Sequence, residues 1–439
     1  MELILATIIF LATIFLIIVG IIDRSVIAIF GAIVMILTGI LSETEAFFAV
    51  DWNIIALLIG IWIIATYFNK SGIPKLLAVK IFSLSKRRTA LLISLLGLLA
   101  GFLSVFLDNV IVVLMMASII VPMLKPMKVR VTPFILFSAL CANFMGTALL
   151  LGDLPPQMLH SVTGIEFLEF IWQFNKPSSF PILTASFILT ILAFYYLRFK
   201  REFKVQQNEN LPDFSTLLSD EGALIEDRRL ATIVTFFFIA TIVTMSFRQF
   251  LGVKLGLIAF AGAVLLVATV EILGKWIQKP SFEEILTALD WKAVIFYIAL
   301  FILVGGINKA GLIKLIAELL TPLLSNPLIG STALYWFTVP IVGIVEHDAY
   351  ILTFLHVIKD LSSIVDPWPY WWLLLWAGTI GSNLTMVGAP ALYIALNLCE
   401  KEDGRVSLKE FFSMTIPFVL ISSSINYLLA MFIWIMPPV

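Results

Sequence analysis

The sequence predicts an all-α polytopic membrane protein, and three observations support that fold class. Of the 439 residues, 61% are hydrophobic and only 13% are charged, which is more apolar than a soluble protein tolerates. Apolar runs of about 18–25 residues recur along the chain, long enough to cross a hydrocarbon core roughly 30 Å thick. One stretch of the chain also occurs twice, which predicts two related halves.

The duplicated stretch can be aligned without gaps. Residues 51–78 and 290–317 are identical at ten of 28 positions, with a constant offset of 239. The identical positions include polar ones, and chance similarity between apolar segments would not keep those in register. Asp51 and Asp290, which open the two segments, are expected to cap the helices that follow. The chain therefore contains an internal repeat.

Basic residues in short loops predict the orientation of the two copies. Loop 69–88 has six Lys/Arg and no acid, and 125–130 is also basic, so both are expected to be cytoplasmic together with the polar segment 199–229. The corresponding loops of the second copy, near 308–332 and 359–369, contain acids and fewer basic residues. The two copies are therefore predicted to be inverted relative to each other, as in many secondary transporters.

The hydropathy of the chain predicts about 10–11 spans. Ten are expected at 2–22, 25–41, 52–68, 134–158, 181–198, 229–247, 255–272, 291–307, 370–398 and 411–435. The apolar stretches 89–124 and 333–358 must enter and leave on one side for the orientation to hold, so each is predicted to contain a re-entrant hairpin. The predicted domains are a first inverted repeat at 1–198, a cytoplasmic linker at 199–228 and a second inverted repeat at 229–439.

Ionisable residues interrupt both predicted hairpins. Asp108 and Asn109 lie within "FLSVFLDNVIVVLMM", and Glu346, His347 and Asp348 lie between two long apolar runs. An acid at the centre of a membrane helix costs about 2.5–3.5 kcal/mol on insertion scales, so such residues are functional by default. At a hairpin tip, they can cap a half-helix or coordinate a cation.

A spanning segment that contains glycine and proline follows each hairpin. Such breaks free backbone groups, which a bilayer tolerates only inside the protein or beside a wet cavity. The two segments read "GTALLLGDLPPQ" and "GTIGSNLTMVGAP". Their candidate site residues are Gly146, Thr147, Gly152 and Asp153 in the first, and Ser382, Asn383, Thr385 and Gly388 in the second.

Together, the two hairpin tips and the two broken helices predict one binding site near the membrane midplane. Half-helix N-termini favour anions, whereas carboxylates and free carbonyls favour cations. The structural alternatives are helix caps at the tips and close packing by small residues at the breaks. For Asp153, a cap beside Pro155 is as well supported as a binding role. The aromatic cluster at 367–376 is expected to lie at the membrane interface.

The motifs "LDNV" at 107–110, "GTALLLGDLPPQ" and "GTIGSNLTMVGAP" resemble the ion transporter superfamily. The resemblance is to the group that holds arsenite permeases, NhaD-type sodium/proton antiporters and the pink-eyed-dilution protein. Citrate and dicarboxylate/sodium symporters are related. The resemblance covers nearly the whole chain and implies a homodimer with an elevator mechanism. Two departures are Glu346-His347-Asp348 at the second tip, where the family often has Asp-Asn, and Pro155-Pro156-Gln157 at the first break.

The acids at the interruptions favour a secondary active transporter that binds Na⁺ or H⁺. No Lys or Arg lies at the four interruptions, and a buried carboxylate can be neutralised by either cation. Sodium/proton exchange is favoured, with Na⁺ expected at Asp108, Asn109, Glu346 and Asn383. His347 is expected to titrate beside this site. The alternative is Na⁺- or H⁺-coupled transport of an anion, either arsenite or a di- or tricarboxylate, and an ion channel is a weaker alternative.

Other classes of function have little support in the sequence. The net charge of −1 argues against a nucleic-acid partner. Three histidines and two cysteines offer no zinc motif, and no nucleotide motif is present. We therefore expect no enzyme activity and no cofactor beyond the coupling ion. The compact chain suggests the cytoplasmic membrane of a prokaryote, with the lipid bilayer and a small ion as partners.

Overall fold

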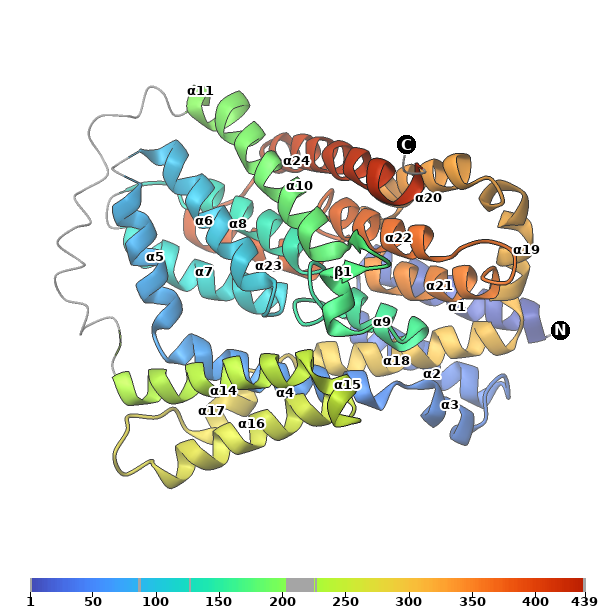
Figure 1. Cartoon of the computed structure of the whole chain (residues 1–439), viewed down its shortest axis with the longest axis horizontal. Helices are drawn as coiled ribbons and strands as arrows, with labels where there is room; N and C mark the ends of the chain where they lie inside the picture. The colour runs from blue at the N-terminus through green and yellow to red at the C-terminus, as the bar shows by residue number, and fades with distance from the viewer. Residues whose placement is uncertain (1, 86–87, 126–127, 203–224, 226, 437–439) are drawn as a thin grey trace.

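The computed structural model describes residues 2–85, 88–125, 128–202, 225 and 227–436, and these residues are almost entirely helical (Figure 1). The first half of the chain contains α1 (Glu2–Val19), α2 (Arg24–Leu37), α3 (Glu43–Ala49), α4 (Trp52–Lys70), α5 (Ile73–Leu84), α6 (Thr89–Ser104), α7 (Asn109–Leu124), α8 (Thr132–Met145), α9 (Leu154–Thr163) and α10 (Ser179–Phe194). The second half repeats this series as α14 (Arg228–Ser246), α16 (Leu255–Ile272), α17 (Phe282–Thr287), α18 (Trp291–Lys309), α19 (Leu312–Leu324), α20 (Pro327–Val342), α21 (His347–Asp360), α22 (Trp368–Ser382), α23 (Pro390–Asp403) and α24 (Leu408–Ala430).

Short elements complete the chain. They are η2 (Phe167–Phe170), the paired strands β1 (Trp172–Gln173) and β2 (Lys176–Pro177), η3 (Tyr195–Phe199), α11 (Lys200–Glu202), α15 (Arg248–Leu251) and η4 (Met431–Ile435). The predicted all-α fold is confirmed, as are a helical hairpin and a broken helix in each half. Most of the predicted linker 199–228, and parts of the basic loops 69–88 and 125–130, lie outside the described residues.

The helices form two layers (Figure 1). One layer, called the scaffold layer, holds α1–α4 and α14–α18, and most of it lies along the lower side in Figure 1, whereas α1 packs beside α2 behind α21. The other, called the hairpin layer, holds α6–α10 and α20–α24. Helices α5 and α19 connect the two layers at opposite ends of the molecule, which places each hairpin at its own end with its tip toward the centre.

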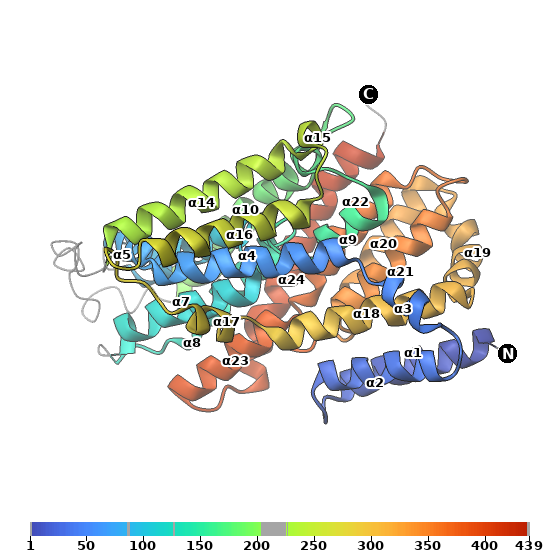
Figure 2. The ribbon, with the colours of Figure 1, turned by 90° about the horizontal axis from the view of Figure 1, so that it is seen from below.

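The two halves run in opposite directions. Helix α4 runs from α3 toward α5, and α18 runs the other way, from α17 toward α19 (Figures 1 and 2). As a result, the end of α4 meets α17 of the second half, where Lys70 pairs with Glu284. The end of α18 likewise meets α3, where Lys309 lies 2.6 Å from Glu45. The two ion pairs occupy equivalent positions in the two repeats.

Local sequence signals explain why both repeats start α4 and α18 in the same way. Asp51 caps α4 by accepting hydrogen bonds from the N–H groups of Asn53 and Ile54, and Asp290 caps α18 through the N–H of Ala293. The predicted capping roles of these two acids are confirmed.

Glycines allow the scaffold helices of the two halves to pack closely. A Cβ at Gly60 of α4 would lie 2.5 Å from the backbone of Ala259 in α16. On the other side, α18 packs on α2, and a Cβ at Gly306 would lie 2.9 Å from the sulfur of Met35. Each half therefore completes the packing of the other half, and the scaffold layer is an intertwined unit.

Seven helices among the described residues are long and apolar enough to cross a membrane. They are α1, α4, α10 with its continuation to Glu202, α14, α16, α18 and α24 with its continuation to Ile435. The hairpin helices and the first segments of the broken helices are shorter, with 14–16 residues each. The interruptions of the helices explain these lengths, because each short helix has one end at a hairpin tip or a helix break inside the protein.

The prediction of an interfacial aromatic belt is wrong for the core of that cluster. Trp372 and Trp376 of α22 are fully buried, and their rings stack at a centroid distance of 5.8 Å. The indole N–H of Trp372 donates to Gln173, and that of Trp376 donates to Ser179. These tryptophans therefore pack inside the hairpin layer and not against lipid headgroups.

Candidate functional site

The two hairpin tips place acids at the starts of half-helices. Asp108 caps α7, because its carboxylate accepts hydrogen bonds from the N–H groups of Val110 and Ile111 at 2.9 and 3.3 Å. Glu346 caps α21 in the same way through the N–H of Ala349 at 3.0 Å. An acid at this position is stabilised by the free N–H groups and the helix dipole. Both tips are buried, with Asp108 8% and Glu346 2% exposed.

The two broken helices end near the same tips but differ in their caps. Asp153 caps α9 by accepting from the N–H of Leu154 at 2.9 Å. Helix α23 begins after Ala389, whose side chain cannot accept a hydrogen bond, so the start of this helix has no side-chain cap. Pro390 is the first residue of the helix. Of the four half-helices that start in the protein interior, three are thus capped by acids and one is not.

A small cavity lies where these ends meet. The hairpin layer contributes Asp108, Asn109, Val110, Asp153, His347, Asp348 and Pro390 to its lining. The scaffold layer contributes Arg24, Trp62, Asp290, Ala293 and Tyr297. The cavity therefore lies at the boundary between the two layers and is lined by residues of both repeats.

A buried amide network holds the two halves of the site together. Asn109 Nδ2 donates to Asn143 Oδ1 at 2.9 Å and to Asp153 Oδ2 at 3.0 Å. Asn143 Nδ2 in turn reaches Ser382 Oγ at 2.9 Å and Asn383 Oδ1 at 3.1 Å. All five of these residues are 4% exposed or less. The network joins the first hairpin tip and the breaks of both spanning segments.

Charged groups cluster at the second hairpin tip. His347 Nε2 lies 3.3 Å from Asp348 and 4.0 Å from Asp153, and Nδ1 lies 3.9 Å from Glu346. Arg24 Nη1 lies 3.4 Å from Glu346. The ring nitrogens of His347 and the carboxylate oxygens of Asp348 are buried without a hydrogen bond among the described residues. Buried polar atoms are normally paired, so the lack of full pairing at these atoms makes them the candidate contacts for a bound ion.

Comparison with known proteins identifies the family. A family model described as a citrate transporter matches residues 14–377, which is most of the chain. The chain belongs to the citrate transporter (CitMHS) family. This membership confirms the resemblance to the ion transporter superfamily, and the protein is an integral membrane transporter.

The transporter's relatives include bacterial and animal proteins. An uncharacterized transporter of Mycobacterium bovis is 24% identical over 419 residues, which cover 93% of each chain. An uncharacterized transporter of Synechocystis is 22% identical over 434 residues and covers 93% of this chain and 92% of its own. The human P protein is 24% identical over 452 residues, which cover 86% of this chain and 53% of the human protein. The transporter thus aligns with about half of that animal relative.

The remaining predicted residues lie beside the cavity and not on it. The glycines allow close packing. A Cβ at Gly152 would lie 2.0 Å from a backbone oxygen, and one at Gly388 would lie 2.5 Å from another. A Cβ at Gly146 would lie 3.1 Å from Asp153. Thr385 donates its hydroxyl to the carbonyl of Gly343. The Thr147 hydroxyl is buried without a partner among the described residues. The binding roles assigned to these residues stay predictions.

Two features of the site were not predicted from the sequence. Arg24 and Tyr297 reach the cavity from the scaffold layer, far from the interrupted segments in the chain. The signal for Arg24 was a charged residue between two apolar runs. Asn143 lies three residues before the motif "GTALLLGDLPPQ" and does not interrupt its helix. The ligand atoms of Glu346, His347 and Asp348, which were predicted as ion-binding residues, lie within 4.8 Å of one another, a spacing that could hold a metal ion.

Proposed function

We propose that the protein is a secondary active transporter that binds its coupling cation at the buried acidic cluster and exchanges Na⁺ for H⁺. The observation that carries this proposal is the charge balance of the cluster. Asp108, Asp153, Glu346 and Asp348 contribute four carboxylates, and all four are buried.

The nearby bases are too few to neutralise these acids. Arg24 supplies one positive charge and His347 at most one, so the cluster carries at least two uncompensated negative charges when every carboxylate is ionised. Uncompensated charge is costly in a low-dielectric interior. A sodium ion or a proton relieves that cost, and competition between the two for the same carboxylates gives exchange.

The two-layer arrangement supports an elevator mechanism. The acids and the amide network belong to the hairpin layer, whereas Trp62, Ala293 and Tyr297 cover them from the scaffold layer. Movement of the hairpin layer along the scaffold layer would carry the intact site from one side of the membrane to the other. A homodimer and a prokaryotic cytoplasmic membrane stay predictions within this proposal.

A second candidate function is cation-coupled transport of a carboxylate anion such as citrate. Arg24 favours it, because a guanidinium at a cavity is suited to carboxylate recognition, and the uncapped start of α23 at Pro390 adds a positive dipole end. Membership of a family named for citrate transport points the same way. In this case, the acids bind the coupling ion beside the anion.

Transport in proteoliposomes distinguishes these functions. The purified protein is reconstituted with a trapped pH dye, and an inward Na⁺ gradient is imposed first alone and then with citrate. Exchange predicts a Na⁺-driven pH change without citrate, which Asp108→Asn and Glu346→Gln abolish. Glu318→Gln, which alters an exposed acid of α19, serves as the matched control and should transport normally.

The outcomes separate the two candidates. A pH change or labelled citrate uptake that appears only when citrate is present would replace exchange with anion transport. A Na⁺ flux that runs only down its gradient, and that is the same with and without citrate and causes no pH change, would identify a channel. It would contradict both transport proposals.

A further inference from the structure

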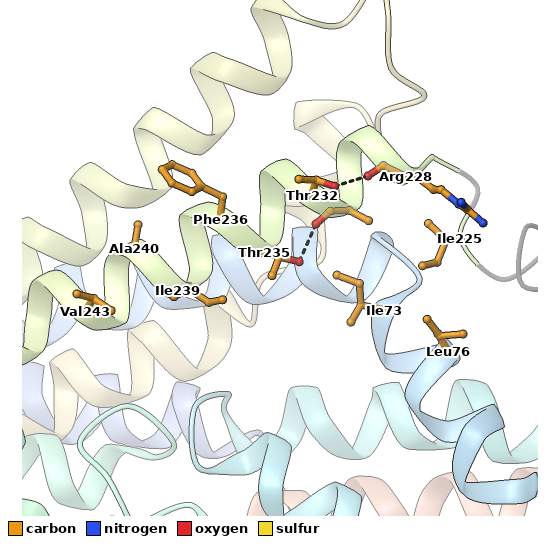
Figure 3. Close-up of a pocket in the computed structure, with 11 residues that line it drawn as sticks. Ile73, Leu76, Ile225, Arg228, Thr232, Thr235, Phe236, Ile239, Ala240 and Val243 are labelled. Carbon is orange, nitrogen blue, oxygen red and sulfur yellow. Dashed lines mark hydrogen bonds between the residues drawn. The ribbon is translucent and has the colours of Figure 1, made fainter.

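An apolar groove of about 750 Å³ lies on the scaffold layer, away from the candidate site. Helix α14 forms its floor with Phe236, Ile239, Ala240 and Val243, and α5 forms one wall with Ile73 and Leu76 (Figure 3). Two hydroxyl groups reach the groove, but both are used within α14. Thr232 donates to the carbonyl of Arg228, and Thr235 donates to that of Ala231. The groove therefore suits an apolar occupant.

One end of the groove continues into a basic pocket. Arg228 lines the groove and also a second hollow of about 490 Å³, which is formed with Arg229, Lys275 and Trp276. The three basic residues face one acid, Asp227, whose carboxylate already caps α14 by accepting from the N–H groups of Arg229 and Leu230. The apolar groove and the basic pocket thus meet at Arg228.

We propose that this composite site binds an anionic phospholipid of the surrounding leaflet. The phosphate of the headgroup would lie against Arg228, Arg229 and Lys275, and one acyl chain would follow α14. From Arg228 to Val243 the helix rises about 22 Å, enough for a chain that crosses one leaflet of a core roughly 30 Å thick. Trp276 beside the basic pocket is typical of the membrane interface.

The charge of the pocket favours an anionic lipid over other occupants. Clustered Lys and Arg near a membrane surface attract anionic headgroups. The basic pocket is formed by residues at the start of α14 and after the end of α16, and Figure 1 shows these helix ends at the same end of the molecule as α5. Because α5 connects the two layers, the bound lipid would lie beside the joint between them.

Native mass spectrometry of the full-length protein tests this site. Phosphatidylglycerol and phosphatidylcholine, with identical acyl chains, are added at equal concentration to the delipidated protein. We expect a several-fold preference for phosphatidylglycerol. The triple variant Arg228→Gln/Arg229→Gln/Lys275→Gln should reduce that preference to parity. Lys254→Gln, at the opposite end of α16, is the matched control and should leave it unchanged.

A second variant keeps the test informative if the triple variant folds poorly. Ala240→Trp fills the groove without changing charge and should reduce retention of both lipids at an unchanged melting temperature. Equal binding of the two lipids by the unaltered protein would overturn the proposal, as would a preference that survives the triple variant. A dimer that separates in Ala240→Trp would also overturn it, by showing that a second copy of the chain occupies the groove.

Discussion

Asn143 joins parts of the molecule that are far apart in the sequence. Its amide accepts from Asn109 at the first hairpin tip and donates to Ser382 and Asn383 at the break of the other half. The side chain is fully buried, so none of these bonds can be replaced by bulk water. A single amide therefore fixes the relative position of elements that line the cavity.

We expect Asn143→Ala to destabilise the protein and to stop transport. The substitution leaves several buried polar groups unpaired, and each unpaired group costs about 1–3 kcal/mol. Thermal unfolding in detergent measures the loss. Ser138→Ala is the control on the same helix, because the Ser138 hydroxyl is equally buried but has no hydrogen-bond partner among the described residues. An unchanged melting temperature in Asn143→Ala would contradict the structural role of the network.

Arg24 offers a test of what the cavity binds. Its guanidinium lies 3.4 Å from Glu346 and 4.7 Å from the centre of the Phe296 ring, and it opposes any cation that enters the cluster. We expect Arg24→Gln to tighten Na⁺ binding by about tenfold, which corresponds to roughly 1.4 kcal/mol. Sodium-dependent protection against thermal unfolding measures this affinity.

The same variant has the opposite effect on an anion. If Arg24 contacts a carboxylate substrate, Arg24→Gln should abolish uptake of that substrate, and Arg24→Lys should restore part of it because the charge returns without the planar guanidinium. Weaker Na⁺ binding in Arg24→Gln would contradict a repulsive role for Arg24.

At the scale of elements, the short helices α3 and α17 connect the two repeats. Each begins at a serine that accepts from the N–H of a glutamate three residues later, Glu45 in α3 and Glu284 in α17. The same glutamates pair with Lys309 and Lys70 of the other half. One local motif thus serves as a helix cap and as a clamp between repeats.

We expect reversal of one charge in the Lys309–Glu45 ion pair to destabilise the protein, and reversal of both charges to restore its stability. Lys309→Glu should lower the melting temperature slightly, since exposed ion pairs contribute little. Lys309→Glu/Glu45→Lys should recover the lost stability. Lys314→Glu, an exposed charge change on α19, is the control. If the melting temperature of the double variant stays low, Lys309 and Glu45 do not stabilise the protein through their ion pair.

The clamp should also persist at low pH. Hydrogen bonds from Lys309 and Ser42 lower the pKa of Glu45 to about 2. A lowered pKa means that the stabilisation is complete above the usual pKa of a glutamate and is lost only as pH falls toward about 2. The difference in melting temperature between Lys309→Gln, which removes the charge without adding an acid, and the unaltered protein should therefore be nearly the same at pH 7 and pH 5. A difference that disappears by pH 5 would contradict the lowered pKa.

At the scale of the whole molecule, two layers enclose one site between them. Ion pairs cross from layer to layer, as between Glu166, which follows α9, and Arg248, which follows α14. Both side chains are less than one-fifth exposed. A transporter that works by relative movement of its layers must break such contacts in each cycle.

We expect a covalent link across the layers to stop transport. Glu166→Cys/Arg248→Cys, made in a background without Cys141 and Cys399, is treated with a reducible bifunctional thiol reagent. Transport should fall to background and return on reduction. Lys70→Cys/Glu284→Cys links two elements of the scaffold layer and should remain active after the same treatment. Full activity of the linked Glu166–Arg248 variant would contradict movement between the layers.

The sequence by itself determined the elements of this protein. Apolar runs, helix caps such as Asp51 and Asp290 and the repeat at 51–78 and 290–317 are local or periodic signals, so they can be read without knowing contacts. The same holds for the hairpin tips, because charged residues inside apolar runs can be recognised from the sequence alone. The fold class, the hairpins and the broken helices followed from these signals.

The tertiary structure alone decided which residues meet. Arg24 starts α2 and Asn143 lies within α8, far along the chain from the second hairpin and the second break, and only packing between repeats brings them to Glu346 and Asn383. Likewise, Trp372 and Trp376 look like interface residues in sequence but are buried because the hairpin layer covers them. Contacts between distant segments depend on how helices pack against one another, and hydropathy and spacing along the chain carry no record of that packing.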